Sequence, residues 1–499
     1  MADRLRPSSE EASREHAGGT GQSSTDARES FVLSRIEHWD AAARRMLCRR
    51  GWGGYYHQRL QEVYSHLAPR GGRVLELGCG QGDLLAALRP SLGVGIDFSK
   101  EMLQQAAARH PDLRFVCADA QEWTPRNAFD TVILSDLAND AWDVQALLER
   151  ARQSCGPQTR LLINTYSRLW ELPLSLAQRM GLATSNLPQN WLAPEDVENL
   201  LGLAGFEVVR RWVEIFCPLP VPLLGRLMNR YLVKVWPFSL FALTHLFVAR
   251  RKPQTRPEGA PPSVSVVVPV RNEEGNIPSI FDGVPQMGAG TELVFVEGGS
   301  TDRTFEAIEA AQAAHPEYRC VLLRQRGQGK GDAVREGFGR ATGEVLMILD
   351  GDLTVPPEDL PRFYEALVRG IGEFVNGVRL VYPMEDQAMR FANLVANKCF
   401  SLAFSWLLGQ DVKDTLCGTK VLWRRDYEKL AANRADFGDF DPFGDFDLLF
   451  GAAKLNLKIV DIPIRYRERT YGTTNIQRWR HGWMLLKMVL FASRKIKFV

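Results

Sequence analysis

The stretch Met347-Ile-Leu-Asp350-Gly-Asp352-Leu decides how the second half of this 499-residue sequence folds. Its apolar run predicts a buried strand that leads directly into two aspartates separated by one glycine. Two carboxylates at the end of a buried strand are costly unless a positive group lies beside them. A hard divalent cation, Mg²⁺ or Mn²⁺, bridging a diphosphate supplies that charge. Taken alone, the stretch is equally compatible with an ordinary Asp-Gly turn.

Other segments of the second half carry polar residues at comparable places. One apolar run leads into Pro269, Arg271 and Glu273, and the next ends at Glu297. Lys330 lies between glycines at the predicted start of a helix. A lysine at a helix N-terminus is well suited to bind phosphate. Together these segments favour a nucleotide site over an isolated turn.

Both halves of the sequence alternate short apolar strands with helical stretches. This alternation predicts an α/β protein whose parallel sheets are covered by helices on both faces. Ligands of such sheets bind at the carboxyl ends of the strands, so the chemistry is expected there. In the first half, strands are expected at 73–77, 93–97, 114–117, 131–135 and 160–164. In the second half, they are expected at 265–269, 292–297, 320–323, 345–350 and 373–377.

In their order and spacing, the motifs of residues 263–475 resemble the family 2 glycosyltransferases with the GT-A fold. The closest resemblance is to the dolichyl- and polyprenyl-phosphate sugar transferases. It implies an inverting transfer of a sugar from a UDP- or GDP-linked donor, with Asp350 and Asp352 holding the metal. Gly298 replaces the second of two aspartates that the family carries after its second strand. The donor-binding residues implied are Pro269, Arg271, Glu273, Glu297, Lys330, Asp350, Gly351 and Asp352.

The same resemblance identifies an acceptor side. It implies that Arg379 and Arg390 bind the acceptor phosphate, because a guanidinium forms paired hydrogen bonds with phosphate. Arg469 aligns with an arginine in a late loop of the family. Asp414 is the candidate base if the acceptor is a hydroxyl, whereas a phosphate acceptor needs no strong base. Surface salt bridges and a turn aspartate are the plainer alternatives.

A glycine-rich loop marks the first half. Val74-Leu-Glu-Leu-Gly78-Cys-Gly80-Gln-Gly82 joins a predicted strand to a helix. Glycine lets the backbone approach a ligand closely and adopt a positive φ. The next strand ends at Asp97, whose carboxylate can accept hydrogen bonds from both hydroxyls of a ribose. The third strand leads to Asp119, which can hold an adenine amino group.

Over about 180 residues, these motifs resemble the class I S-adenosylmethionine-dependent methyltransferases, which have a Rossmann-like fold. The resemblance implies that Gly78 and Gly80 line the methionine part of S-adenosylmethionine (SAM) and that Asp97 holds the ribose. A dinucleotide site fits less well, because it requires Gly-x-Gly-x-x-Gly. The remaining cofactor-binding residues implied are Glu76, in the loop motif, and Asp119 with Ala120 at the adenine. The methyl acceptor is not specified; Tyr55, Tyr56, His57 and Tyr166 are candidates near the cofactor, or ordinary packing residues.

Changes in composition and the positions of proline and glycine divide the sequence into a tail, two domains and a linker. Residues 1–30 read as a disordered tail and 253–262 as a linker rich in proline. The domains expected are 31–252, methyltransferase-like, and 263–475, GT-A, followed by a basic amphipathic tail at 476–499. The net charge of +2 gives no case for nucleic-acid binding. Eight scattered cysteines form no Cys-x-x-Cys pair, which fits a reducing, cytoplasmic location.

The end of the sequence suggests contact with a membrane. From Ile464 to Val499 there are nine Lys or Arg and one Glu, interleaved with Trp, Leu and Met. Such a mixture suits an anionic membrane surface. No uninterrupted apolar run of about 20 residues is present. We therefore expect a peripheral protein at the inner face of the membrane, or else a tail helix that packs on its own domain.

Three functional hypotheses follow from the sequence. The first is a bifunctional enzyme that glycosylates a polyprenyl phosphate or glycan intermediate and methylates a related product. The second keeps the glycosyltransferase but makes the methyltransferase-like domain a SAM-binding or scaffold module. The third replaces the lipid acceptor with a soluble one.

Overall fold

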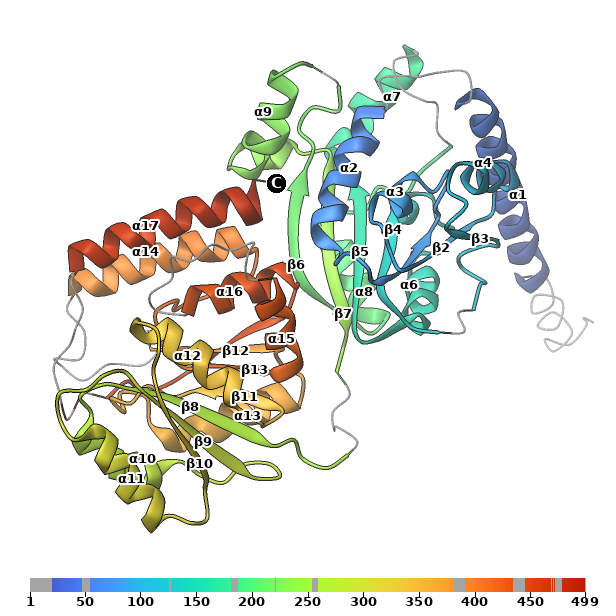
Figure 1. Ribbon diagram of the computed structural model, residues 1–499. Helices are drawn as coiled ribbons and strands as arrows, with labels where there is room; N and C mark the ends of the chain where they lie inside the picture. Colours follow the sequence, from blue (N-terminus) through green and yellow to red (C-terminus); the bar gives the residue numbers. More distant parts are fainter. Residues whose placement is uncertain are drawn as a thin grey trace, which may run out of the picture. The chain divides into compact units, whose positions relative to one another are not determined.

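The computed structural model describes residues 20–46, 54–124, 127–180, 187–219, 221–253, 259–379, 391–433, 445–467, 469, 471 and 478–498. The chain divides into two compact units, whose main boundary lies between Arg251 and Lys252. This division lies next to the predicted linker. Each unit contains one seven-stranded sheet (Figure 1).

The sheet of the first unit has the order β3-β2-β1-β4-β5-β7-β6. Strands β1 to β5 pair in parallel, and β7 pairs antiparallel with β5. The five strands predicted for this half are confirmed. The strands are β1 (Arg73–Leu77), β2 (Leu92–Asp97), β3 (Arg114–Cys117), β4 (Phe129–Ser135), β5 (Cys155–Tyr166), β6 (Phe206–Glu214) and β7 (Thr244–Arg251).

Helices cover this sheet because its strands carry apolar side chains on both faces. The cluster of α6 and α8 side chains includes Leu147, Leu148 and Leu201, packed with Val132 and Ile163 of the sheet. The helices are α1 (Thr20–Met46), α2 (Gly54–Leu67), α3 (Asp83–Ala87), α4 (Lys100–Arg109), α5 (Leu137–Asp140), α6 (Val144–Gln153), α7 (Glu171–Arg179), α8 (Pro194–Leu203) and α9 (Leu224–Arg230). Short 3₁₀ turns lie at η1 (Arg168–Trp170), η2 (Leu232–Lys234) and η3 (Phe238–Phe241).

Helix α1 corrects one expectation. It begins at Thr20, so residues 20–30 are helical, although the sequence was expected to be disordered through residue 30. Contacts with the rest of the unit explain the difference. Arg28 pairs with Asp119 and Glu122, and the ring of Phe31 packs edge-on against Trp142. These partners lie far along the chain, and local composition could not indicate them.

The sheet of the second unit has the order β10-β9-β8-β11-β13-β12-β14. The expectation of a parallel sheet is wrong at one place, because β13 lies antiparallel between β11 and β12. Its four residues, Lys420–Trp423, are too short for a distinct sequence signal. The other strands are β8 (Val264–Val270), β9 (Thr291–Glu297), β10 (Arg319–Arg324), β11 (Val345–Ile348), β12 (Phe374–Val378) and β14 (Ile459–Pro463).

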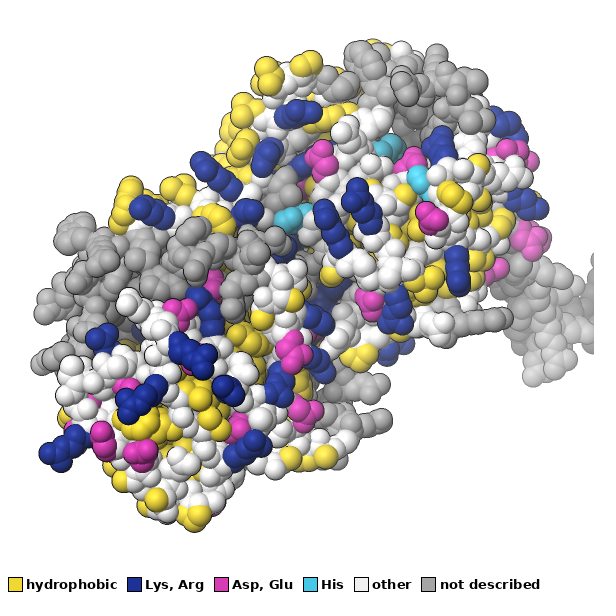
Figure 2. All heavy atoms as spheres, viewed as in Figure 1, with side chains coloured by type: hydrophobic (Ala, Val, Ile, Leu, Met, Phe, Trp, Pro, Cys, Tyr) yellow, Lys and Arg dark blue, Asp and Glu magenta, His cyan; other side chains and the backbone are white. Residues whose placement is uncertain are grey.

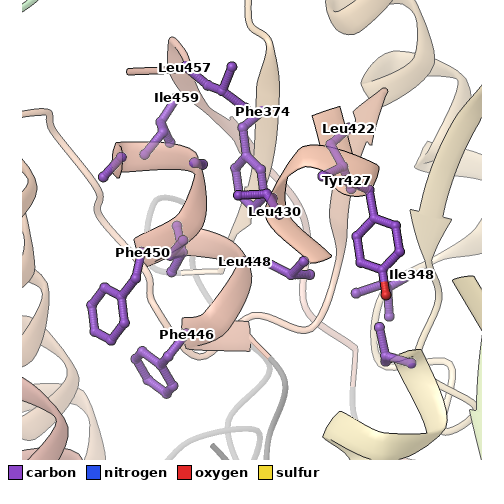
Figure 3. Packing of buried hydrophobic residues seen from close by; sticks show 14 of the residues in the cluster. Ile348, Phe374, Leu422, Tyr427, Leu430, Phe446, Leu448, Phe450, Leu457 and Ile459 are labelled. Carbon is purple, nitrogen blue, oxygen red and sulfur yellow. The ribbon is translucent and has the colours of Figure 1, made fainter. Parts of the chain in front are cut away.

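Alternate residues of β8 point to opposite faces of this sheet. Val266 and Val268 pack with α10, α11 and α13, whereas Val267 packs with α12. Figure 3 shows part of the cluster that contains Val267, which also includes Leu430, Phe450 and Phe374 of β12. The helices are α10 (Ile277–Gly283), α11 (Thr304–Ala314), α12 (Gly329–Arg340), α13 (Leu360–Val368), α14 (Phe391–Leu408), α15 (Arg424–Ala432), α16 (Asp445–Lys454) and α17 (Arg478–Ala492). Shorter turns lie at η4 (Glu274–Asn276), η5 (Pro357–Asp359) and η7 (Ser493–Lys497).

Over the residues that the structure describes, no helix combines the length and the apolar character needed to cross a bilayer.

Candidate active sites

The aspartate pair lies just beyond a central strand of the second unit. β11 ends at Ile348, two residues earlier than expected, and Leu349 continues the ladder through its N–H to the Val267 carbonyl. The chain then turns, and the N–H of Leu353 donates to the carbonyl oxygen of Asp350 at 3.2 Å. The predicted Asp-Gly turn is therefore present. It presents both aspartates at the carboxyl edge of the parallel strands, where a ligand site is expected.

Lys330 pairs with the first of these aspartates. It lies in the first turn of α12, and its Nζ is 2.6 Å from Asp350 Oδ1. Gly418 lies against both groups, because a Cβ there would overlap Asp350 Oδ2 and Lys330 Nζ. The glycine thus makes room for the charged pair. Its importance could not be read from the sequence, in which Gly418 is 68 residues from Asp350.

Arg469 links the second aspartate to the strand β8 loop. Its Nη2 is 2.6 Å from Asp352 Oδ2, and its Nη1 is 3.7 Å from Glu273 Oε1. Burial raises the pKa of Asp352, but the charge of Arg469 and the hydrogen bonds from Thr354 and Arg469 together outweigh burial and leave that pKa below its usual range. Burial also raises the pKa of Glu273. Arg469, which was predicted to bind the acceptor, therefore contacts Asp352, predicted to hold the metal, and Glu273, predicted to bind the donor.

The residues of this turn fit a divalent cation. Asp350 and Asp352 supply only carboxylate oxygens, the donors that Mg²⁺ and Mn²⁺ prefer. Each carboxylate also faces one cation, Lys330 or Arg469. A metal with its diphosphate would join a site that already balances negative charge. Among the described residues, no cluster of three or more His, Cys, Asp or Glu side chains is arranged to hold a metal.

The other predicted donor residues lie around the same edge. Glu297 is buried at the end of β9, and its Oε1 accepts a hydrogen bond from the Ser300 N–H at 2.5 Å. Gly298 lets the Gln325 side chain approach closely, since a Cβ would lie 2.9 Å from Gln325 Oε1. Gly351 packs in the same way on Val270 and Pro269. Arg271 is exposed.

Arg379 and Asp414 form a buried pair on the acceptor side. Arg379 Nε and Nη2 donate to Asp414 Oδ2 and Oδ1 at 2.7 and 2.9 Å. The backbone N–H groups of Arg379 and Leu416 donate to the same carboxylate. The Asp414 side chain is 0% exposed, and the pair raises the pKa of Arg379 despite its burial. A carboxylate held by four donors is poorly placed to accept a proton from an acceptor. The remaining predicted acceptor residue, Arg390, lies outside the described residues.

The glycine loop of the first unit has the predicted conformation. Gly78, Gly80 and Gly82 have φ values of 72°, 50° and 74°, which favour glycine. The Gly80 N–H donates to Asp97 Oδ2 at 2.8 Å, and the Ser99 N–H donates to Asp97 Oδ1 at 2.9 Å. Burial raises the pKa of Asp97. The loop and the acid at the end of β2 therefore meet at one edge of the sheet.

Two observations support a ligand at this loop. Glu76 is 2% exposed, and its Oε2 has no hydrogen-bond partner within the described part of the chain. Burial raises the pKa of Glu76 well above its usual range. A Cβ at Gly80 would meet none of the described atoms within 4 Å, which indicates open space. At the adenine position, Ala120 is buried, and Asp119 receives hydrogen bonds from the Gln121 N–H and from Arg28.

A further acidic group was missed in the sequence. Asp136 follows β4 with a φ of 59°, and its Oδ1 accepts hydrogen bonds from Tyr56 Oη at 2.8 Å and Asn164 Nδ2 at 2.5 Å. The Tyr56 and Tyr166 rings lie 5.9 Å apart. Burial raises the pKa of Asp136 to about 6, against these hydrogen bonds, which lower it. The sequence could have indicated Asp136, because an acidic residue directly after a parallel strand lies at the edge of the sheet where ligands bind.

Asp136 lies beside the glycine loop. A Cβ at Gly78 would be 2.8 Å from Leu137 Cδ1, so the residue after Asp136 packs directly on that loop. Of the aromatic candidates from the sequence, Tyr56 and Tyr166 thus reach this acid. His57 is exposed, and its ring lies edge-on to the Tyr56 ring, with the ring centroids 5.2 Å apart.

Comparisons with protein families give one match in each unit. Residues 265–431 match the model of glycosyl transferase family 2, and residues 52–211 match a methyltransferase domain. The two predicted resemblances are confirmed. Each match contains most of the site residues described for its unit.

Individual relatives extend the comparison. An undecaprenyl-phosphate 4-deoxy-4-formamido-L-arabinose transferase of Pectobacterium carotovorum is 28% identical over 216 residues, 42% of this chain and 62% of the relative. The chain thus spans less than two thirds of that relative. Glycosyltransferase AglJ of Haloferax volcanii is 30% identical over 227 residues, 45% of this chain and 70% of the relative. A solved SAM-dependent methyltransferase from Mesorhizobium loti is 22% identical, with a TM-score of 0.31, over 38% of this chain and 96% of its own.

Proposed function

The chain belongs to glycosyl transferase family 2 through its second unit, and we propose that this unit transfers a sugar from a nucleotide sugar to a polyprenyl phosphate. The observation that carries the proposal is the edge where Asp350 and Asp352 meet Lys330 and Arg469. Two carboxylates and two cations suit a metal-bound diphosphate. The name of the arabinose transferase supports a lipid phosphate as the acceptor.

On the donor side, acidic residues would bind the metal and a basic residue would bind the phosphate. Asp350 and Asp352 would hold Mg²⁺ or Mn²⁺, which when bound neutralises the leaving diphosphate. Lys330, at the N-terminus of α12, would contact a phosphate oxygen directly. Pro269, Arg271, Glu273 and Glu297 would surround the nucleoside. The nucleotide, UDP or GDP, is left open by these contacts.

On the acceptor side, the buried pair favours a phosphate over a hydroxyl. A phosphate acceptor is already a competent nucleophile, so direct displacement with inversion requires no base. Asp414 would then act as a positioning residue that fixes the Arg379 guanidinium. Arg379, Arg390 and Arg469 would provide the positive charge that receives the acceptor. A soluble phosphorylated acceptor is the alternative.

The first unit is a SAM-dependent methyltransferase domain, and we propose that it binds SAM and transfers its methyl group. The glycine loop with Asp97 supports binding, and the unpartnered Glu76 oxygen suits a cationic methionine group. The alternative is a SAM-binding module without turnover.

Asp97→Ala should weaken SAM binding about ten- to a hundredfold, because hydrogen bonds to a charged group contribute about 1.5–3 kcal/mol. Titration calorimetry measures the effect. Asp112→Ala, a matched change at an exposed aspartate of the same unit, should leave the affinity unchanged. If wild-type protein binds no SAM, both the methyl-transfer proposal and its scaffold alternative with bound SAM are overturned.

Methyl transfer to an O–H acceptor requires that its proton leave as the methyl group arrives. Asp136 is suited to receive that proton, because its carboxylate is fixed by Tyr56 and Asn164 beside the glycine loop. A base with a pKa near 6 is deprotonated at neutral pH and still basic enough to act.

Asp136→Asn should lower the methyl-transfer rate about a hundredfold while SAM binding persists. In the wild type, the rate should rise as pH increases through about 6, because the base works only when deprotonated. The variant should lose this rise. Asp130→Asn, which alters an exposed aspartate paired with Arg73, serves as the control. An unchanged pH profile in Asp136→Asn would exclude Asp136 as the base.

The side chains of the C-terminal helix support a peripheral location at a membrane. Trp483, Leu486 and Leu490 of α17 are exposed, and Lys487 lies over the Trp483 ring at 5.7 Å. Apolar and basic side chains on one helix suit an anionic membrane. We propose that the tail, residues 476–499, touches the membrane that holds the lipid acceptor.

A further inference from the structure

The first unit carries an apolar surface that neither proposed reaction uses. Between Leu219 and Phe241, eleven large apolar side chains are exposed, led by Leu223 at 84% and Trp236 at 76%. Figure 2 shows hydrophobic side chains gathered over α9, with Lys or Arg side chains beside them. Single exposed apolar residues are ordinary, but a contiguous group marks an interaction site.

The charge of this segment indicates its partner. Residues 219–241 contain three basic residues and no Asp or Glu. Arg226 and Arg230 are exposed four residues apart on α9, where Leu224 and Leu227 are exposed as well. Leucines that enter the acyl boundary beside arginines that reach lipid phosphates are typical of an interfacial helix. Tyr231 and Trp236 are of the types enriched at the membrane–water boundary.

The segment is firmly attached, so its exposure does not come from a loose loop. Asn229 is 1% exposed, and its Oδ1 accepts hydrogen bonds from the Phe216 and Cys217 N–H groups at 2.7 and 2.8 Å. Lys234 and Arg59 both pair with the buried Glu214. These polar anchors hold the apolar side chains outward.

The surface also adjoins the candidate methyl site. Asn229 Nδ2 donates to Tyr55 Oη at 3.2 Å, and the next residue, Tyr56, donates to Asp136. On the other side, Trp170 Nε1 donates to the Phe241 carbonyl, and Leu172 and Leu176 of α7 continue the exposed apolar group.

We propose that residues 219–241 dock the methyltransferase unit on an anionic lipid bilayer. The docked unit would present the Asp136 site to an acceptor at the membrane surface. The docking itself rests on neither the glycosyl-transfer nor the methyl-transfer proposal, because it follows from the surface alone.

Flotation of the full chain with vesicles tests the proposal. Wild-type protein should bind phosphatidylcholine vesicles that contain phosphatidylglycerol. Leu223→Glu/Leu227→Glu should lower the partition coefficient at least about tenfold, because two charges replace apolar side chains at the acyl boundary. Leu203→Glu alters a leucine exposed to 58% on α8 and should float like the wild type. Circular dichroism should be unchanged in all variants, since the altered side chains are exposed.

A second pair of variants separates charge from apolar contact. Arg226→Ala/Arg230→Ala should weaken binding to anionic vesicles about tenfold or more, since each basic residue contributes about fivefold there. Binding to neutral vesicles should not change. The proposal is overturned if the leucine variant floats like the wild type, or if the wild type fails to float. It is equally overturned if the leucine variant only converts a dimer into a monomer, which would identify a second copy of the chain as the occupant.

Discussion

Asp350→Asn is expected to reduce sugar transfer at least about a thousandfold. The substitution keeps the size of the side chain but removes the negative charge that faces Lys330 at 2.6 Å. The metal that Asp350 and Asp352 would hold then loses one of these two carboxylate ligands, and Lys330 loses its ion pair with Asp350. Stabilisation of a leaving diphosphate contributes several kcal/mol, and a thousandfold corresponds to about 4 kcal/mol.

Release of the nucleotide diphosphate, measured with and without Mg²⁺ or Mn²⁺, checks this result. The wild type should lose activity in a chelator and regain it on metal addition. Asp359→Asn is the matched control, because Asp359 pairs with Arg362 on the surface of the same unit. Full activity of the wild type in the chelator would remove the metal from the proposal. Full activity of Asp350→Asn would remove the site itself.

Arg379→Ala is expected to lower the free energy of unfolding by about 3–5 kcal/mol. The Asp414 carboxylate is 0% exposed and would lose its two side-chain donors while remaining charged. Removal of one partner of a buried ion pair costs about this much, because the remaining charge is buried without its counter-charge and is not hydrated in its place. Urea denaturation followed by tryptophan fluorescence measures the change.

Two further variants test whether the loss of stability comes from the buried charge of Asp414. Arg379→Ala/Asp414→Ala should be less destabilised than Arg379→Ala, because the uncompensated charge is gone. Arg362→Ala breaks an exposed pair with Asp359 and should change the free energy by less than about 1 kcal/mol. Equal losses in Arg379→Ala and Arg362→Ala would mean that Asp414 is hydrated rather than buried.

The local pattern of apolar residues was sufficient to predict most of the strands. All ten expected strands are present, because a run of apolar residues bounded by turn residues needs no distant partner to be recognised. β13 was not expected, since four residues between loops have no periodicity of their own. The helical state of residues 20–30 was missed for a related reason, because Arg28 and Phe31 acquire their partners only in the folded unit.

By itself, the sequence determined the two fold classes, the resemblance of each half to a known family and the two edges where ligands are expected. The glycine loop and the Asp350–Asp352 turn are local motifs, because consecutive residues determine their backbone conformation. Only the tertiary structure decided which side chains meet at those edges. Arg469 reaches Asp352 across 117 positions, Tyr56 reaches Asp136 across 80, and Asp414 is held by Arg379 across 35. Such contacts depend on how the strands are ordered in the sheet. The residues that neighbour a charged or aromatic residue in the sequence do not indicate which distant partner it contacts in the fold.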